Sequence, residues 1–400
     1  MADQNWRDQF REFGSQLRDD LIRAGRHAVV HHESRCYAID PYRGYGNSRR
    51  ALIAGRVTEC RSIPAASASD STLRNLLSTW RRIDADPLPF ARVRASLCGT
   101  EVEVIADDEG FFREMITLDN PLPSNAPWQE ATIQLLEPLR EEQPDVRVVS
   151  RIRVLNENAE YGVISDLDDT VIQSRITNFL QAVRTAMLDN SRTRLPFPGV
   201  SEFYQALARG GDGKRDNPIF YVSSSPWNIH DLIADFLDIQ RIPEGPICLR
   251  DWDFNLSALA SNRIQKHKQP LIDEIMGLFP SLKFILIGDS AQKDPEIYSA
   301  ITRDHPGRIL AIYVRNIQRA PERIASVQKL AEEVLAAGSS LILADDTVAA
   351  AVHAAENGFI SAGALPAIRE EKKADEGTTG TKVDAPGVPA QPATPTVVVE

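Results

Sequence analysis

Three aspartates follow directly on an apolar segment of the sequence. Asp166, Asp168 and Asp169 come after YGVIS at 161–165. A carboxylate can attack phosphorus and form an acyl phosphate, which divides one difficult displacement into two easier steps. Asp166 is placed for that role. Asp168 would lie on the same side of an extended backbone, where it can protonate a leaving alkoxide and then activate water. The stretch predicts phosphoryl transfer, with a solvated acidic turn as the alternative.

Other polar residues come next to further apolar segments. They are Ser223, Ser224 and Ser225 after PIFYV, Asp289 and Asp294 after KFILIG, and Lys266 and Lys268 ahead of the helix leading into KFILIG. In an open parallel sheet, ligands bind beyond the carboxyl ends of the strands. We therefore expect these side chains to gather around Asp166 at one edge of a sheet.

Carboxylates that face a phosphate dianion would repel it, so this chemistry requires a divalent cation. Mg²⁺ prefers carboxylate, carbonyl, water and phosphate oxygens. Asp166 and Asp289 can supply carboxylates, and Asp168 can supply a backbone carbonyl. Asp294 would hold the ion through water or orient another ligand. We expect Mg²⁺ as the cofactor, with these four aspartates as its site.

The phosphate itself needs hydrogen-bond donors and a positive charge. Ser223 can donate to a phosphoryl oxygen, and Ser224 and Thr170 are further candidates for contact with the substrate. The cation is Lys268 or Lys266. Each of these motifs alone is weak in a chain with 56 acidic residues. Their joint occurrence, in order and each at the end of its own element, favours a site.

Residues 156–365 alternate between strand and helix patterns. The apolar runs YGVIS, PIFYVSS, KFILIGD and RILAIYV are typical of strands buried on both faces. Helical segments, among them VSEFYQALARG, IHDLIADFLD and LIDEIMGLF, lie between them. This alternation predicts an α/β domain with a doubly wound parallel sheet.

Residues 36–155 show a different pattern, made of short runs with alternating polarity. The runs lie at 52–57, 91–97, 101–106, 111–118, 131–136 and 146–155. Each suits a half-buried strand, and a helix is expected near 70–82. We predict a small antiparallel β-sandwich domain ahead of the α/β domain.

The two ends of the chain differ from both domains. Within residues 1–35, apolar side chains recur at helical spacing, which predicts an amphipathic helix. This helix packs on its own protein, makes peripheral contact with a membrane or binds a partner helix. Residues 366–400 begin with charged residues and contain few large apolar ones, so we expect a disordered tail.

Composition excludes some functions. A net charge of -11 argues against nucleic acid as a partner. The four cysteines form no CxxC pair, so neither a zinc cluster nor a disulfide framework is expected, and a reducing cytoplasm fits best. The first residues lack the apolar core of a signal peptide, and no run of eighteen apolar residues appears. We expect a cytoplasmic protein, with peripheral membrane contact as an open alternative.

The ordered set of motifs resembles the haloacid dehalogenase superfamily of phosphohydrolases. The matching residues are Asp166, Asp168 and Thr170, then Ser223, then a lysine, then Gly288, Asp289 and Asp294. More narrowly, the sequence is similar to the actin-patch-associated phosphatidate phosphatase family. The stretches that carry this resemblance are SDLDDTV, PFPGV, FYVSSSPWN, HK and KFILIGDSAQKDPEIY. The family spacing favours Lys268 over Lys266.

The resemblance implies a haloacid dehalogenase-like fold and magnesium-dependent removal of phosphate from phosphatidate, which gives diacylglycerol. The first alternative is a phosphatase of a soluble phosphoester or a phosphoprotein. The second is a binding module in which the catalytic domain has become a scaffold. The presence of both Asp166 and Asp168 argues against the scaffold, because a degenerate site would be expected to have lost one of them.

Overall fold

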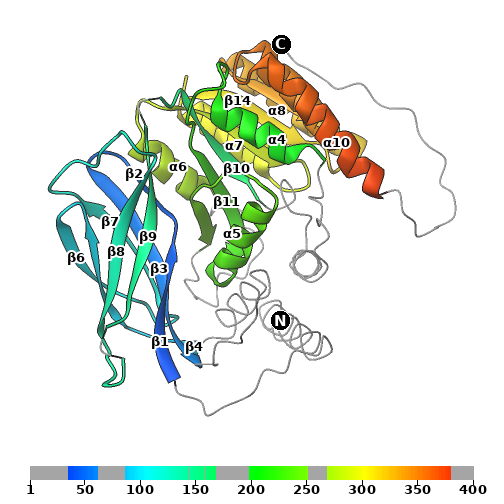
Figure 1. Cartoon of the computed structure of the whole chain (residues 1–400). Helices are drawn as coiled ribbons and strands as arrows, with labels where there is room; N and C mark the ends of the chain where they lie inside the picture. The colour runs from blue at the N-terminus through cyan, green and yellow to red at the C-terminus, as the bar shows by residue number, and fades with distance from the viewer. Residues whose placement is uncertain are drawn as a thin grey trace. The chain divides into compact units, whose positions relative to one another are not determined.

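The structure is a computed structural model that describes residues 35–61, 86–143, 145–156, 158–167, 198–250 and 268–379. The helices expected within 1–35 and near 70–82 lie outside these ranges, as does the chain beyond 379. The chain divides into two compact units, one built around the strands before residue 155 and one around the strands after it (Figure 1). Each unit has its own sheet.

The second unit contains a six-stranded parallel sheet, as predicted for an α/β domain. Its strands are β10 (Tyr161–Asp166), β11 (Ile219–Pro226), β12 (Ile247–Arg250), β13 (Lys283–Asp289), β14 (Ile309–Arg315) and β15 (Ser340–Ala344). Their order is β12-β11-β10-β13-β14-β15, and all neighbours are parallel. Every residue of β10 and all but the first of β13 are buried, because helices cover both faces. The central strands β10 and β13 are neighbours, although the starts of their paired segments, Tyr161 and Lys283, are 122 positions apart in the sequence.

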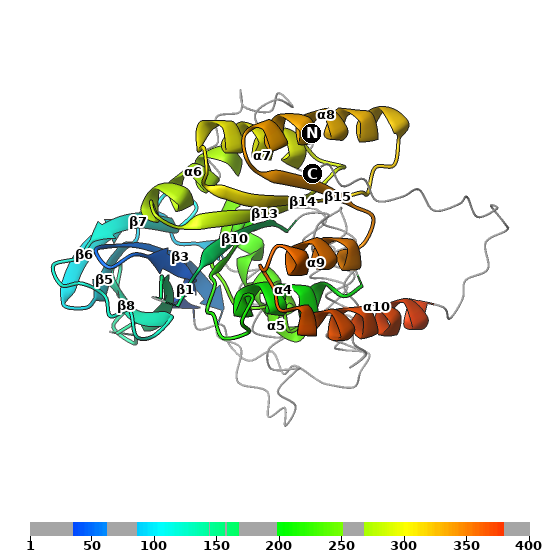
Figure 2. The ribbon, with the colours of Figure 1, turned by 90° about the horizontal axis from the view of Figure 1, so that it is seen from above.

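The helices of this unit lie in two layers. They are α4 (Val200–Arg209), α6 (Lys268–Leu278), α7 (Asp294–Asp304), α8 (Pro321–Ala336), α9 (Thr347–Glu356) and α10 (Leu365–Thr379). Most of α5 (His230–Ile239) belongs to the first unit. Figure 2 shows α6, α7 and α8 on one side of the sheet and α4, α9 and α10 on the other. Among the described helices, none combines the length and the apolar character needed to cross a bilayer.

The first unit contains a nine-stranded sheet. Its strands are β1 (Arg35–Tyr42), β2 (Gly44–Gly46), β3 (Arg50–Arg61), β4 (Asp86–Pro87), β5 (Arg92–Leu97), β6 (Thr100–Ile105), β7 (Phe111–Thr117), β8 (Trp128–Glu137) and β9 (Arg147–Val154). We expected an antiparallel sandwich, but hydrogen bonds join all nine strands into one sheet, in which β2 and β9 are parallel. The long strand β3 pairs with β1, β2, β4 and β7. The six predicted runs fall on β3 and β5 to β9, whereas β1, β2 and β4 were not predicted. Alternating polarity identifies a strand but not its partners.

The tail prediction is wrong for residues 366–379, which form most of α10. Ile368 is fully buried, and two carboxylates of α10 cap the N-terminus of α4. Glu371 Oε2 accepts from the backbone N–H of Glu202 at 2.9 Å, and Asp375 Oδ2 accepts from that of Gly199 at 3.1 Å. Composition suggested too little apolar surface for order, but contacts to unsatisfied helix N–H groups stabilise this helix.

The cysteines correct a second expectation. Cys36 is disulfide-bonded, and the antiparallel register of β1 and β3 sets it opposite residue Cys60 in the backbone. Cys98 and Cys248 carry free thiols. The lack of a CxxC pair is no guide here, because residues that face each other across two strands can be far apart in the sequence.

Candidate active site

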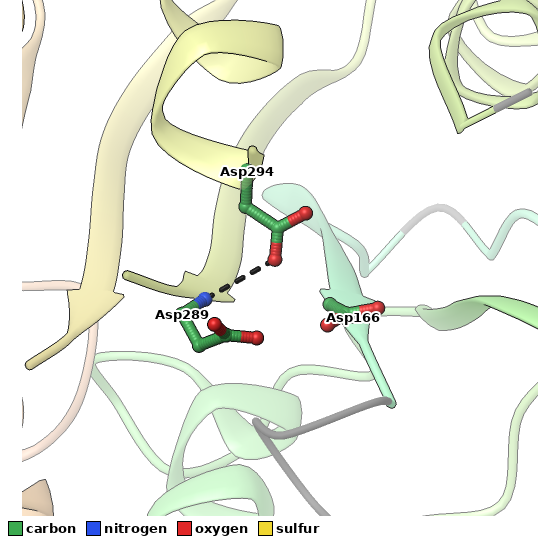
Figure 3. Close-up of side chains that lie close together, drawn as sticks. All are labelled: Asp166, Asp289 and Asp294. Carbon is green, nitrogen blue, oxygen red and sulfur yellow. Dashed lines mark hydrogen bonds between the residues drawn. The ribbon is translucent and has the colours of Figure 1, made fainter. Parts of the chain in front are cut away.

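Three of the predicted aspartates meet at the carboxyl edge of the parallel sheet. Asp166 ends β10, Asp289 ends the neighbouring strand β13, and Asp294 is the first residue of α7. All three side chains are fully buried. Each has a carboxylate oxygen within 4.8 Å of the others (Figure 3). The parallel pairing of β10 with β13 positions these residues, as expected for a site at a sheet edge.

Lys268, the first residue of α6, places its ammonium between two of these carboxylates. Its Nζ lies 2.7 Å from Asp166 Oδ1 and 2.8 Å from Asp294 Oδ1. The lysine is only 4% exposed, so its charge is buried with theirs. Lys266, the alternative lysine, lies outside the described residues. The geometry therefore brings Lys268 into the site.

The turn between β13 and α7 is held by the aspartates at its two ends. Asp289 Oδ1 accepts from the backbone N–H groups of Ala291 at 2.6 Å and Gln292 at 2.9 Å. Asp294 Oδ2 accepts from the backbone N–H of Asp289 at 3.1 Å. At Gly288, a Cβ would lie 2.5 Å from Asp294 Oδ2. Glycine is therefore required where the Asp294 carboxylate crosses β13.

Two buried tyrosines support the strands that end in Asp166 and Asp289. The hydroxyl of Tyr298 on α7 donates to the carbonyl of Ile287 at 3.0 Å, and that of Tyr204 on α4 lies 2.6 Å from Ser165 Oγ. Burial raises the pKa of both phenols well above the usual range, and nearby aspartates raise it further. Both hydroxyls therefore stay protonated at neutral pH and remain hydrogen-bond donors.

The remaining predicted residues divide into two groups. Ser223 is buried on β11, one position beyond Val222, which pairs with Asp166. Its Oγ accepts from the backbone N–H of Ser225 at 2.9 Å. Asp168 and Thr170 lie outside the described residues, and for Ser224 only the backbone is described. The roles assigned to these three residues stay predictions.

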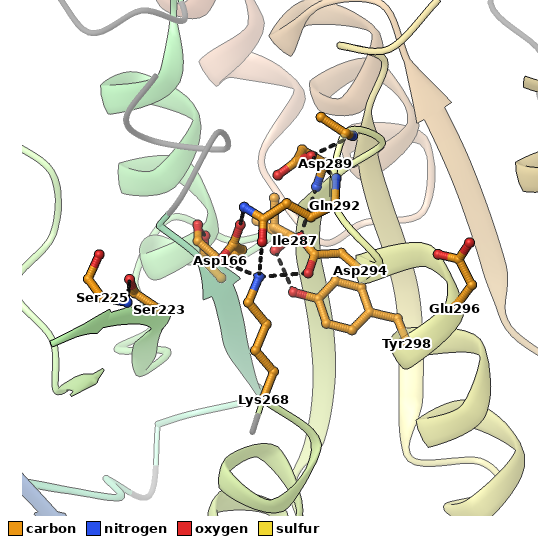
Figure 4. A network of polar contacts seen from close by, with 12 residues as sticks. Asp166, Ser223, Ser225, Lys268, Ile287, Asp289, Gln292, Asp294, Glu296 and Tyr298 are labelled. Atoms are coloured by element: carbon orange, nitrogen blue, oxygen red, sulfur yellow. Dashed lines mark hydrogen bonds and ion pairs between the residues drawn. The ribbon is translucent and has the colours of Figure 1, made fainter. Parts of the chain in front are cut away.

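Gln292 is a contact residue that the motifs did not single out. Its Nε2 donates to Asp166 Oδ2 at 3.5 Å, and its Oε1 accepts from Lys268 Nζ at 3.2 Å (Figure 4). It lies inside the stretch GDSAQKD, where only the glycine and the two aspartates match the signature. Nothing in the signature marks it, since the intervening positions are free to vary.

The donor set fits a divalent cation. Three carboxylates and one ammonium leave two negative charges on the residues Asp166, Asp289, Asp294 and Lys268. Buried charges of one sign are costly unless a counter-charge meets them. All the donor atoms are oxygens, which suits a hard cation. The cluster can therefore hold a metal ion between β10 and β13, where a phosphate ester would also bind.

Comparison with known proteins places this site within a recognised domain. Residues 161–316 match the family model described as "Phosphatidate phosphatase APP1, catalytic domain". The family resemblance drawn from the motifs is thereby confirmed. The matched segment contains all four charged residues of the cluster.

Two curated relatives extend this match. Phosphatidate phosphatase APP1 of Saccharomyces cerevisiae is 30% identical over 201 residues, which cover 50% of this chain and 30% of the yeast protein. An uncharacterized protein of Schizosaccharomyces pombe is 25% identical over 222 residues, which cover 54% of this chain and 35% of that protein. The aligned region thus spans about a third of each relative.

Likeness to solved structures is weak. A carbohydrate acetylesterase from Xanthomonas citri aligns with a TM-score of 0.32 and 9% identity, over 82% of this chain and 71% of its own. A score of this size bears on neither fold nor function.

Proposed function

We propose that this protein is a magnesium-dependent phosphatase that converts phosphatidate to diacylglycerol and phosphate through an aspartyl-phosphate intermediate. The observation that carries the proposal is the buried cluster of Asp166, Asp289, Asp294 and Lys268 within the segment similar to the APP1 catalytic domain. Carboxylates and a lysine at one sheet edge are the groups that phosphoryl transfer requires.

In the first step, a carboxylate oxygen of Asp166 attacks the phosphorus atom and the bond from phosphorus to the ester oxygen breaks. The leaving alkoxide takes its proton from the Asp168 carboxyl group. In the second step, the Asp168 carboxylate removes a proton from water as that water attacks phosphorus. The bond to Asp166 then breaks and inorganic phosphate leaves. Lys268, which already contacts Asp166, offsets the charge on the phosphoryl oxygens.

The proposed cofactor is Mg²⁺, because every donor in the cluster is an oxygen. Asp166 and Asp289 would hold it with their carboxylates and Asp168 with its backbone carbonyl. Both oxygens of Asp294 already accept hydrogen bonds, from Lys268 and from the backbone of Asp289. This favours a role for Asp294 through water or by orienting ligands. When bound, the cation would neutralise negative charge that develops on the phosphoryl group.

The test is release of phosphate from phosphatidate in detergent mixed micelles, with Mg²⁺ and with EDTA. We expect Mg²⁺-dependent release in the wild type. In Asp166→Asn we expect a loss of about 10³-fold or more, since the nucleophile is removed. Asp108→Asn, which changes an exposed carboxylate of the first unit, is the matched control. Full activity in Asp166→Asn would exclude the proposed mechanism.

The same assay decides between substrate classes. A panel of soluble phosphomonoesters and a phosphoprotein are measured beside phosphatidate at matched concentrations. Higher kcat/KM for phosphatidate supports the lipid substrate. A strong preference for the soluble panel would keep the chemistry of Asp166 and replace the substrate.

A further inference from the structure

Arg323, on α8, donates hydrogen bonds to the turn that follows β13. It is intermediate in exposure, with its side chain 15% exposed. Its Nε donates to the carbonyl of Ser290 at 2.7 Å and its Nη2 donates to the carbonyl of Gln292 at 2.5 Å. The same guanidinium forms an ion pair with both carboxylate oxygens of Glu296 on α7. One side chain therefore fixes both ends of the segment Ser290–Gln292.

The turn is also tied to the chain after β14. Ser290 N–H donates to the carbonyl of Arg315 at 2.8 Å. Its Oγ accepts from the backbone N–H groups of Ile317 at 2.9 Å and Gln318 at 3.0 Å. These bonds position Ser290, whereas Arg323 also donates to the carbonyl of Gln292 at the other end of the turn.

The side chain of Gln292 points from this turn into the candidate active site, where it contacts both Asp166 and Lys268 (Figure 4). Its amide group donates to the carboxylate of one and accepts from the ammonium of the other. The backbone N–H of the same residue donates to Asp289 Oδ1. A shift of Gln292 would therefore disturb the proposed nucleophile, the lysine and a candidate metal ligand together.

We propose that Arg323 is a positioning residue for phosphoryl transfer, acting through Gln292 on Asp166 and Lys268. The proposal rests on the proposed function of the site. Arg323 lies beyond residue 316, where the match to the family model of the APP1 catalytic domain ends. A guanidinium presents several N–H donors in a fixed plane, so it can hold two carbonyls and a carboxylate at once. A lysine at this position has a single ammonium and would keep the charge without this geometry.

The test is a double-mutant cycle with Arg323→Gln and Gln292→Ala. Wild type, both single variants and the double variant are assayed for kcat and KM, with the soluble ester or the lipid that the wild type hydrolyses. Arg319→Gln, which removes an exposed arginine in the segment before α8, is the matched control, and Arg323→Lys separates charge from geometry. Thermal melting reports the folded fraction, and calorimetric titration with Mn²⁺ reports cation binding without turnover.

We expect Arg323→Gln to lower kcat of the folded protein by about 10- to 100-fold, the usual effect of losing an outer-shell partner. KM should change much less, since the substrate contacts remain. The double variant should lose no more than the worse single variant, because both changes act on one contact. Arg323→Lys should stay well below wild type, and Arg319→Gln should match it.

Three results would overturn the proposal. In the first, Arg323→Gln lowers the melting temperature while kcat per folded molecule stays unchanged, which shows a purely structural role. In the second, the losses of the two single variants multiply in the double variant, which shows that they act independently. The third concerns a wild type that hydrolyses no ester, in which case the proposed function fails. The affinity for Mn²⁺ then tests the positioning role, and equal affinity in wild type and Arg323→Gln would exclude that role as well.

Discussion

Replacement of Lys268 by methionine tests the charge balance of the candidate active site. The ammonium of Lys268 lies within 2.8 Å of carboxylate oxygens of Asp166 and Asp294, and all three side chains are buried. Methionine has similar length and no charge, so Lys268→Met removes the cation and keeps most of the packing. The variant carries one more uncompensated negative charge than the wild type.

The expected cost follows from the two distances. At an effective dielectric constant of about 20, each ion pair has a gross Coulombic energy of about 6 kcal/mol. Desolvation of the buried ions offsets a large part of this energy. Removal of one partner from a buried ion pair costs about 3–5 kcal/mol. We expect the free energy of unfolding of the second unit to fall by about that amount in EDTA.

Urea denaturation followed by far-UV circular dichroism measures this change. Lys283→Met, at the exposed first residue of β13, is the matched control and should stay within about 0.5 kcal/mol of wild type. A cation that binds the folded carboxylates stabilises by mass action, by about 2.7 kcal/mol at a concentration of 100 times Kd. Mg²⁺ should raise the urea midpoint more in Lys268→Met than in wild type, because the variant site is more negative.

Two results would refute this reasoning. If wild type and Lys268→Met unfold at the same urea concentration in EDTA, the ion pairs contribute nothing to stability. If Mg²⁺ raises the midpoint of the variant no more than that of the wild type, the carboxylates and the lysine do not share one charge balance.

Two further predictions concern packing and pH. Gly288→Ala should lower the free energy of unfolding by about 1–3 kcal/mol and abolish phosphate release, because the new Cβ would lie 2.5 Å from Asp294 Oδ2. Gly277→Ala is the control, since a Cβ there would meet no atom within 4 Å, and it should have neither effect. Melting and phosphate-release assays would show this, and an active Gly288→Ala would contradict it. Glu371→Ala should cost about 1 kcal/mol by removing the acceptor for the Glu202 N–H, whereas Glu371→Gln keeps an acceptor. Burial raises the pKa of the Glu371 carboxyl above 4.5, although the Glu202 N–H lowers it. The wild type should therefore lose stability relative to Glu371→Gln as the pH rises from 4.5 through this raised pKa. Above that pKa the difference in stability should stay constant. The prediction would be contradicted if the urea midpoint of the wild type rose relative to that of Glu371→Gln across this pH range.

The long strands of the parallel sheet could be predicted because their residues are apolar on both faces. β10, β11, β13 and β14 fall on the four runs identified in the sequence. The strands β12 and β15, with ICLR and SLILA, are too short for periodicity to separate strand from helix. The pairing of the first nine strands and the order of α10 depend on distant partners, which no local pattern contains.

The acidic residues of the site could be predicted for a related reason. Asp166 and Asp289 end buried strands, and the chemistry at such an edge follows from residue type alone. The roles of Gln292 and Arg323 could not be predicted, because their contacts depend on the path of a turn and on a helix that begins later in the chain. A glutamine or an arginine in isolation carries no comparable signal.

Peripheral membrane contact by residues 1–35 stays a prediction.

The match to the family model of the catalytic domain ends at residue 316, but residues after it also support the site. β14, which lies beside β13, pairs on its other side with β15. Without residues 340–344, β14 would be an edge strand of the sheet. Arg323 holds the turn after Asp289, and α10 caps α4, the helix that carries Tyr204. A buried acidic cluster needs such support because a small displacement of one carboxylate alters the charge balance of all. The residues proposed to do the chemistry therefore lie within a shorter segment than the residues that hold them in place.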